Sequence, residues 1–417
     1  MGQKASALLI FLGAPCLPPR MRALFASLLL AAHAAQPPPC ALNGALQPDG
    51  TCACYGPWRG DDCSQLALGA VPAASGYGLA PALRSSWGGN VLADAAGTYH
   101  LFVAEMALNC TLTTWQTNSF VTHATAAAPE GPYLRQGAPA VGVWGHNPQV
   151  LALADGSFAL FHIGTGVGGT PKNCSWGEGA GAPAAAAVPL APGAGATVHV
   201  AASLEGPWTP FPGVPPCNNP APLLHPNGTL FLACDSATIL RAPALAGPWS
   251  AVHAPSFTNH SNAPIGAFED AFMWIDPRGA WHALFHVWSE EVEPSCVNSN
   301  VSAHAFSTNG LDWHFSPLQP YGTTVTLEDG TSFITPTRER PKLLMGADGE
   351  PTHLLNGAVR DIESCAPHWC SRCKEISQHT FTLVTPLLAG GAGQGSAVNS
   401  RAHALEGGRV GGGAVKI

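Results

Sequence analysis

Short apolar runs separated by turn residues dominate the chain from residue 69 onward. Clear examples span residues 99–104, 158–163, 229–233 and 281–288, each of which follows a turn that contains Gly. Runs of this length, rich in aromatic and aliphatic residues, predict β-strands. No amphipathic stretch of helical length breaks the pattern. The chain is therefore predicted to be all-β over most of its length.

Five polar clusters each stand before an apolar run, at a spacing of roughly 40 to 70 residues. Four of these runs then pass through a turn with Gly after Asp, Asn or Arg and into a second apolar run. A unit repeated at this spacing predicts a propeller or a solenoid. In a propeller the inner strands begin around one axis, so we expect the clusters to form a single pocket. The clusters lie at residues 87–90, 146–148, 218–220, 268–270 and 338–341.

A second repeat places an aromatic residue in the outer part of each unit. Tyr133, Trp208 and Trp249 each follow Gly-Pro directly, and Trp313 ends a variant of the same motif. We expect the Gly-Pro step to form a tight turn and the aromatic ring to cover the face of the next blade. Two repeats in register predict a five-bladed β-propeller over residues 69–388.

The first 35 residues have the character of a secretory signal region. Met21-Arg22 supplies a start and a positive charge, residues 24–32 an apolar core, and residues 32–34 a small-x-small cleavage site. An uncleaved segment would instead anchor the chain, which is the one membrane contact we expect. Two stretches rich in Ala and Gly, residues 177–196 and 389–417, are predicted to be a flexible insertion and a disordered tail.

Residues 36–68 contain four cysteines, in the pattern Cys52-x-Cys54-x-Gly-x-Trp-x-Gly-x-x-Cys63 preceded by Cys40. The pattern resembles the C-terminal half of an epidermal-growth-factor-like module, although that family has six cysteines. The resemblance implies that Cys40 pairs with Cys52 and that Cys54 pairs with Cys63. So small a segment buries little core and would depend on such links. A zinc site is the alternative, but Cys-x-Cys is a poor zinc motif.

A second group of cysteines, Cys365, Cys370 and Cys373 with His368 between them, could bind zinc by spacing alone. Disulfides are favoured because the signal region indicates an oxidising compartment. Such a cross-link would also fasten the propeller ring. The partners are expected among Cys110, Cys174, Cys217, Cys234 and Cys296. Glycosylation of a secreted chain is predicted at Asn109, Asn173, Asn227, Asn259 and Asn300.

Charge is sparse in this chain and negative overall. Charged residues make up 11% of the sequence, the net charge is −8, and no run of Lys or Arg occurs. Nucleic acids and anionic membranes, which bind clustered positive charge, are therefore excluded as expected partners. No phosphate-binding loop, dinucleotide fingerprint or Gly-x-Ser-x-Gly elbow occurs in a fitting context.

The blade pattern and the cluster positions resemble the five-bladed propellers of glycoside hydrolase families 43 and 32, over residues 80–388. That resemblance implies three acidic residues at the starts of inner strands. Glu269 matches the position of the general acid. The two expected Asp positions hold Asn90 and Asn147 instead, and an amide cannot accept a proton at neutral pH. Hydrolysis by a pair of carboxylates therefore needs another acid.

Three interpretations of the clusters follow. In the first, Asp270 or Glu339 replaces the missing carboxylate and the chain hydrolyses O-glycosyl bonds. In the second, the pocket binds an oligo- or polysaccharide without cleaving it, through amide hydrogen bonds and stacking on Trp87, Trp144 or Trp274. In the third, the clusters are structural, and their acids pair with the arginines of the fifth cluster.

We favour the first interpretation and expect a secreted glycosidase; a protein-interaction role is a further class. Glu269 and Asp270 are the predicted catalytic residues. The predicted substrate-binding residues are Trp87, Asn90, His146, Asn147, Asn219, Arg338, Glu339 and Arg340. Most of the 17 histidines are expected in strands with satisfied nitrogens, and no spacing establishes a metal site. No cofactor is required, although an axial calcium ion near His286 or His146 is compatible with the fold.

Overall fold

The computed structural model divides the chain into two compact units, residues 1–38 and 39–417. It describes residues 37–78, 85–173, 197–235, 238–252, 267–288, 301–335, 337–359 and 380–389. The predicted signal region, the 177–196 insertion and residues 390–417 of the predicted tail lie outside these ranges. Within the ranges, no helix combines the length and the apolar character needed to cross a membrane.

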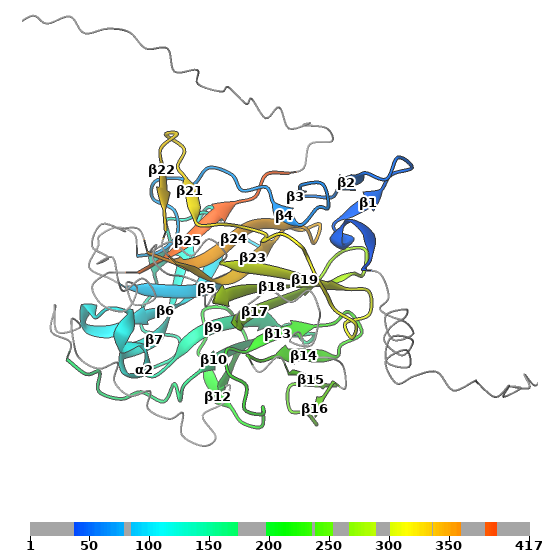
Figure 1. Cartoon of the computed structure of the whole chain (residues 1–417). Coiled ribbons are helices and arrows are strands. Elements are labelled where there is room, and N and C mark those ends of the chain that lie inside the picture. Colours follow the sequence, from blue (N-terminus) through cyan, green and yellow to red (C-terminus); the bar gives the residue numbers. More distant parts are fainter. Residues whose placement is uncertain are drawn as a thin grey trace, which may run out of the picture. The chain divides into compact units, whose positions relative to one another are not determined.

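Five antiparallel sheets form the blades of a β-propeller, which confirms the predicted fold class (Figure 1). Blade one consists of β5 (Ser86–Ala93), β6 (Tyr99–Met106), β7 (Ser119–Ala126) and β8 (Leu134–Arg135). Blade two consists of β9 (His146–Ala152), β10 (Phe158–Ile163), β11 (Thr197–Ala201) and β12 (Thr209–Phe211). Blade three consists of β13 (Ala221–Leu224), β14 (Leu230–Ala233), β15 (Ile239–Ala242) and β16 (Ser250–Ala251).

Blades four and five complete the propeller. Blade four consists of β17 (Ala267–Ile275), β18 (Trp281–Trp288), β19 (Ser302–Ser307) and β20 (His314–Phe315), and blade five of β23 (Arg338–Met345), β24 (Pro351–Ala358) and β25 (Phe381–Pro386). A hairpin of β21 (Thr324–Thr326) and β22 (Ser332–Ile334) lies between them in sequence. The described helices are short: η2 (Pro39–Leu42), η3 (Ala107–Asn109), η4 (Leu112–Thr114) and α2 (Trp115–Asn118).

The inner strands β5, β9, β13, β17 and β23 contact one another in that order and close into a ring. Four of the predicted clusters lie inside these strands, because β5, β9, β17 and β23 begin at or before the first cluster residue. Regular pairing with the second strand breaks after Trp87, Glu269 and Glu339. A break of this kind is a β-bulge, which re-aims the side chains around it.

The segment before blade one closes the ring on the outer strand of blade five. The backbones of Tyr77 and Thr382 hydrogen-bond to each other in both directions, at 3.0 and 2.9 Å. The Gly69 N–H donates to the Pro386 carbonyl at 2.7 Å. We expected a cysteine cross-link near Cys365, Cys370 and Cys373 to fasten the ring; those cysteines lie outside the described residues. Within the described residues, main-chain pairing joins the segment before blade one to β25.

Disulfides in the described residues test part of the cysteine predictions. Cys40 pairs with Cys52 and Cys54 pairs with Cys63, as the growth-factor resemblance implies. Cys217 and Cys234 pair with each other, which removes both from the set of five expected partners for the second cysteine group. The β13–β14 register brings their positions together at the open end of the hairpin. Cys110 is also disulfide-bonded; Cys365, Cys370 and Cys373 lie outside the described residues.

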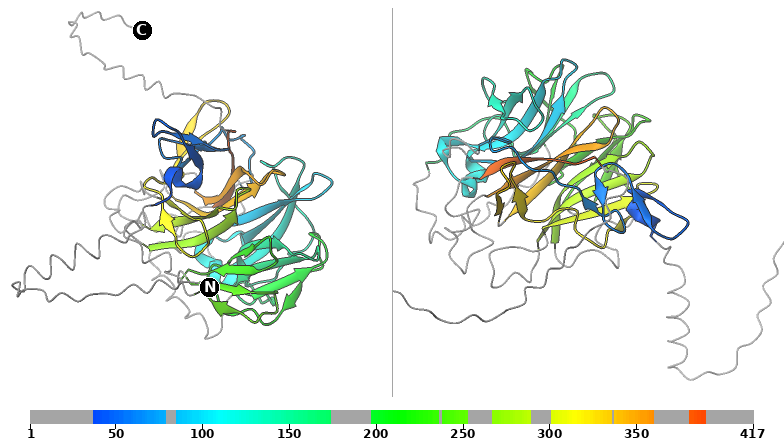
Figure 2. Two further views of the ribbon diagram at one scale, coloured as in Figure 1. Left: turned by 90° about the vertical axis from the view of Figure 1, so that its right-hand side faces the viewer. Right: turned by 90° about the horizontal axis from the view of Figure 1, so that it is seen from above.

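Trp58 attaches the small N-terminal module to blade four. The module contains β1 (Gly44–Leu46), β2 (Cys52–Cys54), β3 (Trp58–Arg59) and β4 (Gln65–Leu66), and Figure 2 shows it in blue beside the yellow and orange strands. The Trp58 ring stacks on Trp274, with 6.4 Å between centroids, and lies 4.8 Å from the His304 ring. Trp274 is therefore covered by protein, which leaves no face of it for a sugar.

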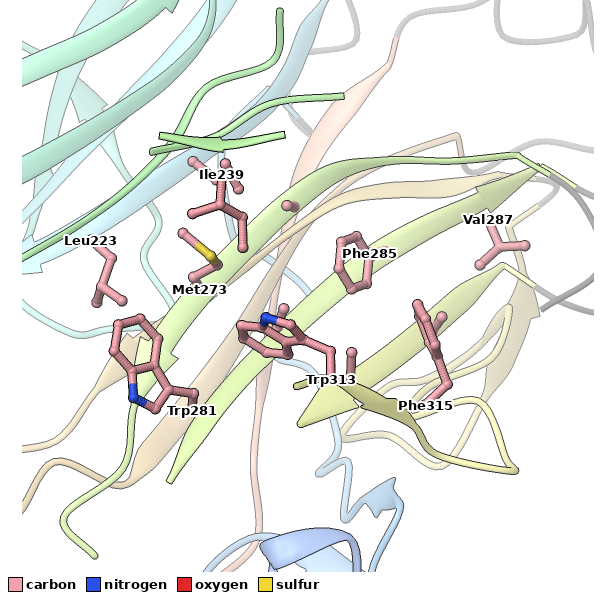
Figure 3. Close-up of a cluster of buried hydrophobic side chains, with 14 residues drawn as sticks. Leu223, Ile239, Met273, Trp281, Phe285, Val287, Trp313 and Phe315 are labelled. Atoms are coloured by element: carbon pink, nitrogen blue, oxygen red, sulfur yellow. The ribbon is translucent and has the colours of Figure 1, made fainter. Parts of the chain in front are cut away.

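Aromatic residues of the second repeat cover the face of the preceding blade, so the prediction that they cover a neighbouring blade is right but its direction, toward the next blade, is wrong. Trp208 of blade two meets Phe102 of blade one edge-on, with 5.3 Å between ring centroids. Trp313 is buried between blades three and four, in one apolar cluster with Leu223 and Met273 (Figure 3). These contacts hold adjacent blades together and keep the inner strands in place around the axis.

Candidate functional site

Each inner strand, or the two residues before it, contains at least one position with a positive φ. The six residues are Gly88 (φ 65°), Gly89 (100°), Asn147 (52°), Asn219 (45°), Asp270 (59°) and Arg340 (56°). Gly, Asn and Asp tolerate this left-handed conformation, whereas Arg rarely adopts it. The conformation turns the backbone at the same place in every blade. Four of these positions have polar side chains, which meet at the axis.

Arg340 is the centre of this polar contact. Its Nη1 donates to Asp270 Oδ1 at 2.6 Å and to Asn219 Oδ1 at 3.0 Å. Asn147 Nδ2 donates to the same Asn219 oxygen at 2.9 Å. Blades two, three, four and five thus each contribute one side chain to a single buried network. Three of these residues, Asn147, Asn219 and Arg340, are predicted substrate-binding residues, and Asp270 is a predicted catalytic one.

Asp235 belongs to the same network and was missed in the sequence. It follows β14, and it accepts hydrogen bonds from Asn218 Nδ2 and Asn219 Nδ2, both at 2.7 Å. Its other oxygen accepts from the Asp270 backbone N–H at 3.3 Å. The signal for it would have been the Cys217–Cys234 disulfide, which places Asp235 opposite the two asparagines. No cluster contains Asp235, so the repeat alone does not point to it.

Glu269 and Glu339 extend the network toward His286. The ligand atoms of Glu269, Asp270, His286 and Glu339 all lie within 4.8 Å of one another. His286 is 3.6 Å from Glu269 and 3.8 Å from Glu339, measured between the nearest nitrogen and oxygen. The Glu269 side chain is 28% exposed, and Asp235 is also partly exposed, whereas Asp270 and Glu339 are buried. Glu269 and Asp235 are therefore the acids of this group that an external molecule can approach.

The electrostatics of the group hold a proton near neutral pH. Burial, and then the charge of Glu269, raise the pKa of the Asp235 carboxyl to about 7. Burial likewise raises the pKa of Asp270 to about 7, although the Arg340 guanidinium opposes the shift and Glu269 and Asp235 add to it. Acids this close titrate as one group, so the proton belongs to the set and not to a single residue.

Two cations, Arg340 and Lys342, lie among the four carboxylates and offset part of their negative charge. Burial acts to lower the pKa of Arg340, but the surrounding acids, Asp270 first, raise it overall and keep the guanidinium charged. Lys342 is buried beside them and donates from Nζ to the Ala271 carbonyl at 3.0 Å; burial lowers its pKa to about 8. The donor atoms around His286 are close enough for a divalent cation. Because side-chain cations already supply positive charge, we assign no metal, and the calcium ion stays a prediction.

Two further predicted residues, Asn90 and Arg338, hydrogen-bond within the scaffold. The amide of Asn90 is bound on both sides by the Val150 backbone, at 2.9 and 3.1 Å, and so joins blade one to blade two. Arg338 is fully buried and donates to Asn356 at 2.9 Å and to Thr385 at 2.8 Å within blade five. In this structure both groups have hydrogen-bonding partners other than the axial network.

The tryptophans predicted to stack on a sugar differ in how much of the side chain is exposed. Trp87 is 1% exposed and packs in an apolar cluster, whereas Trp144 is partly exposed. Trp115, from α2, was missed in the sequence; it is partly exposed, with its ring 6.4 Å from Trp144 and 5.0 Å from His146. Burial and the Arg340 charge lower the pKa of His146 well below its usual value. A neutral imidazole and two indoles therefore lie together at the start of blade two.

Comparison with known proteins finds similarity of fold only. No protein-family model and no curated protein matches the chain. An endo-arabinase from Bacteroides thetaiotaomicron is 14% identical, with a TM-score of 0.43 over 76% of this chain and 97% of that one. A family 117 glycoside hydrolase from Zobellia galactanivorans is 12% identical, with a TM-score of 0.45 over 80% and 91%. Similarity at this level does not identify a reaction, which must be inferred from the chain's own side chains.

Proposed function

We propose that the axial network is the active site of a glycoside hydrolase that acts on an oligo- or polysaccharide. The observation that supports this is the pair of approachable acids, Asp235 and Glu269, in a group that retains a proton near pH 7. Hydrolysis of a glycosidic bond uses two carboxyl groups, one protonated and one ionised. Asp235 thus compensates for the amides that stand at the two expected Asp positions.

We assign roles by exposure and by partners. Glu269 is the proposed general acid, because its exposed side chain can reach a leaving-group oxygen and deliver to it the proton that the coupled acids share. Asp235 is the proposed second carboxylate, oriented by Asn218 and Asn219. Asp270 and Arg340 are proposed to position these groups: Arg340 binds Asn219, and the Asp270 backbone N–H donates to Asp235. Partly exposed indoles at the start of blade two offer apolar faces on which a sugar ring can stack.

The test is a panel of plant and algal polysaccharides incubated with the chain, with release of reducing sugar as the readout. We expect release from at least one member. Binding on a glycan array without any release would contradict hydrolysis and favour a non-catalytic carbohydrate-binding propeller. That second function is suggested by Asn147 and Asn219, because amides both donate to and accept from sugar hydroxyls.

The raised carboxyl pKa values predict an alkaline limit to activity. The acid must be protonated to act, so kcat/KM should fall about tenfold per pH unit above about pH 7 as the coupled acids ionise. The measurement is a pH–rate profile on a cleaved substrate, with circular dichroism at each pH to exclude unfolding. A profile that stays flat to pH 9 would contradict the proposed acid. The control is Glu328→Gln, which removes an exposed carboxylate outside the axial network and should leave the pH–rate profile unchanged.

We further propose that the chain is a secreted glycoprotein. Disulfides in the N-terminal module and in blade three suit an oxidising compartment. Three of the predicted glycosylation sites, Asn109, Asn173 and Asn227, lie on exposed residues. Asn259 and Asn300 lie outside the described residues. A shift in mass after glycosidase treatment of the expressed protein would test this directly.

A further inference from the structure

A cavity lies at the opposite end of the blades from the axial network. Its volume is about 610 Å³, and residues of blades one and two line it. Asp94, in its wall, follows the last residue of β5, whereas the axial network lies at the first residues of the inner strands. The two sites are therefore separated by the length of a strand. Nothing in the proposed hydrolysis uses this cavity.

Three polar residues of blade one form a chain of hydrogen bonds that ends at the cavity. His100 Nε2 lies 3.3 Å from Asp94 Oδ2, and His100 Nδ1 lies 2.9 Å from His123 Nε2. Because the Asp94 carboxylate can only accept, His100 donates to it from Nε2 and accepts at Nδ1. His123 must then donate from Nε2. Its Nδ1 is left with a lone pair and no proton.

The protonation state supports this assignment. Burial, and then the neighbouring His100, lower the pKa of His123 to about 4, so its imidazole is neutral at pH 7. His123 is 6% exposed and lines the cavity. Among the residues that the structure describes, no hydrogen-bond partner reaches its Nδ1. The Nδ1 lone pair therefore faces the cavity, where a donor from outside the chain can reach it.

Blade four contains the same arrangement with the last partner in place. His282 Nε2 faces Asp276 at 3.7 Å, His282 Nδ1 lies 3.1 Å from His304 Nε2, and Ser316 Oγ lies 2.7 Å from His304 Nδ1. In this arrangement a hydroxyl donates to the terminal nitrogen. Trp58 of the N-terminal module covers His304. Blade four therefore indicates that an O–H donor is a suitable partner for the Nδ1 atom of the second histidine.

Gln136 is the residue of blade one that corresponds to Ser316. The Gln136 N–H donates to the His123 carbonyl at 2.9 Å, as the Ser316 N–H does to the His304 carbonyl. The Gln136 side chain turns away, however, and donates to Thr125 Oγ1 at 2.8 Å and to the Leu134 carbonyl at 2.9 Å. In blade one, therefore, no side-chain hydroxyl occupies the position that Ser316 Oγ takes in blade four, and a ligand in the cavity can occupy it.

We propose that this cavity binds a neutral saccharide, one hydroxyl of which donates to His123 Nδ1 in the place that Ser316 Oγ takes in blade four. The lining contains the carboxylates of Asp94 and Glu205 and no Lys or Arg, which disfavours an anionic ligand. Carboxylates accept hydrogen bonds from further hydroxyls. The indole of Trp208 supplies an apolar wall against which a pyranose ring can lie. The ligand class follows from the cavity alone and does not depend on the axial chemistry.

The experiment follows the His123 imidazole signals by NMR while neutral mono- and disaccharides are added to the full chain. We expect at least one sugar to shift these signals in a saturable way. Gln136→Ser should weaken that binding at least tenfold, because the new hydroxyl occupies the Nδ1 of His123 as in blade four. Gln136 is exposed, so this variant should keep the wild-type melting temperature.

The matched control is Gln47→Ser, a change at a glutamine of the N-terminal module, which should bind like the wild type. If no sugar perturbs His123, or if Gln136→Ser binds as tightly as the wild type, the cavity holds only solvent and the proposal is wrong. The outcome is separable from the proposed hydrolysis. A chain that releases no sugar but still shows the His123 shift overturns the axial proposal alone, and the reverse result overturns this one alone.

Discussion

Glu269→Gln is expected to lower kcat on a cleaved polysaccharide about 100- to 10,000-fold, the range for loss of a general acid. The glutamine keeps the size and hydrogen-bonding reach of the side chain but cannot deliver a proton. Because Glu269 is 28% exposed, the melting temperature should change little. The measurement is single-turnover hydrolysis of the best substrate from the panel, with glycan binding recorded for the same variant.

Two comparisons make this result specific. Glu328→Gln removes an exposed carboxylate outside the site and should leave kcat unchanged. Asp235→Asn should reduce kcat as strongly as Glu269→Gln if both acids take part in the reaction. Unchanged turnover in Glu269→Gln would rule out the assigned acid. Loss of turnover with intact binding in both site variants would support the two-carboxylate mechanism.

Arg340→Met is expected to lower the free energy of unfolding by about 3–5 kcal/mol at pH 8, the cost of removing one partner of a buried ion pair. The change leaves the Asp270 carboxylate, 2.6 Å from Arg340 in the native chain, beside two other acids with no guanidinium. Its pKa, already raised, should rise further. Below that pKa the carboxyl is neutral, so the loss should be smaller at pH 5 than at pH 8.

Urea unfolding at the two pH values measures this effect. Arg241→Met, at an exposed arginine on β15, is the control and should change stability little at either pH. The double variant Asp270→Asn with Arg340→Met should be more stable at pH 8 than Arg340→Met alone, because no buried charge is left unpaired. A loss under about 1 kcal/mol at pH 8 would contradict the central role of Arg340.

The blade architecture could be predicted because its signals are local. Each hairpin shows as two apolar runs and a turn with Gly, and the repeat of this unit fixes the number of blades without any knowledge of long-range contacts. The pairing of the module cysteines, Cys40 with Cys52 and Cys54 with Cys63, was implied by the resemblance to the growth-factor-like module, and the structure confirms it. The convergence of four clusters at one axis then follows from the geometry of a propeller.

What the sequence by itself determined is thus the fold and the region of the site. Only the tertiary structure decided which side chains face one another there. The bulges and positive φ angles turn Asn147, Asn219, Asp270 and Arg340 inward, while Asn90 is held by the backbone of the next blade. Asp235 joins the site through contacts with residues of other strands, and its raised pKa depends on burial by them. The orientation and burial of these side chains depend on neighbours that are far away in sequence, so a local sequence pattern cannot predict them.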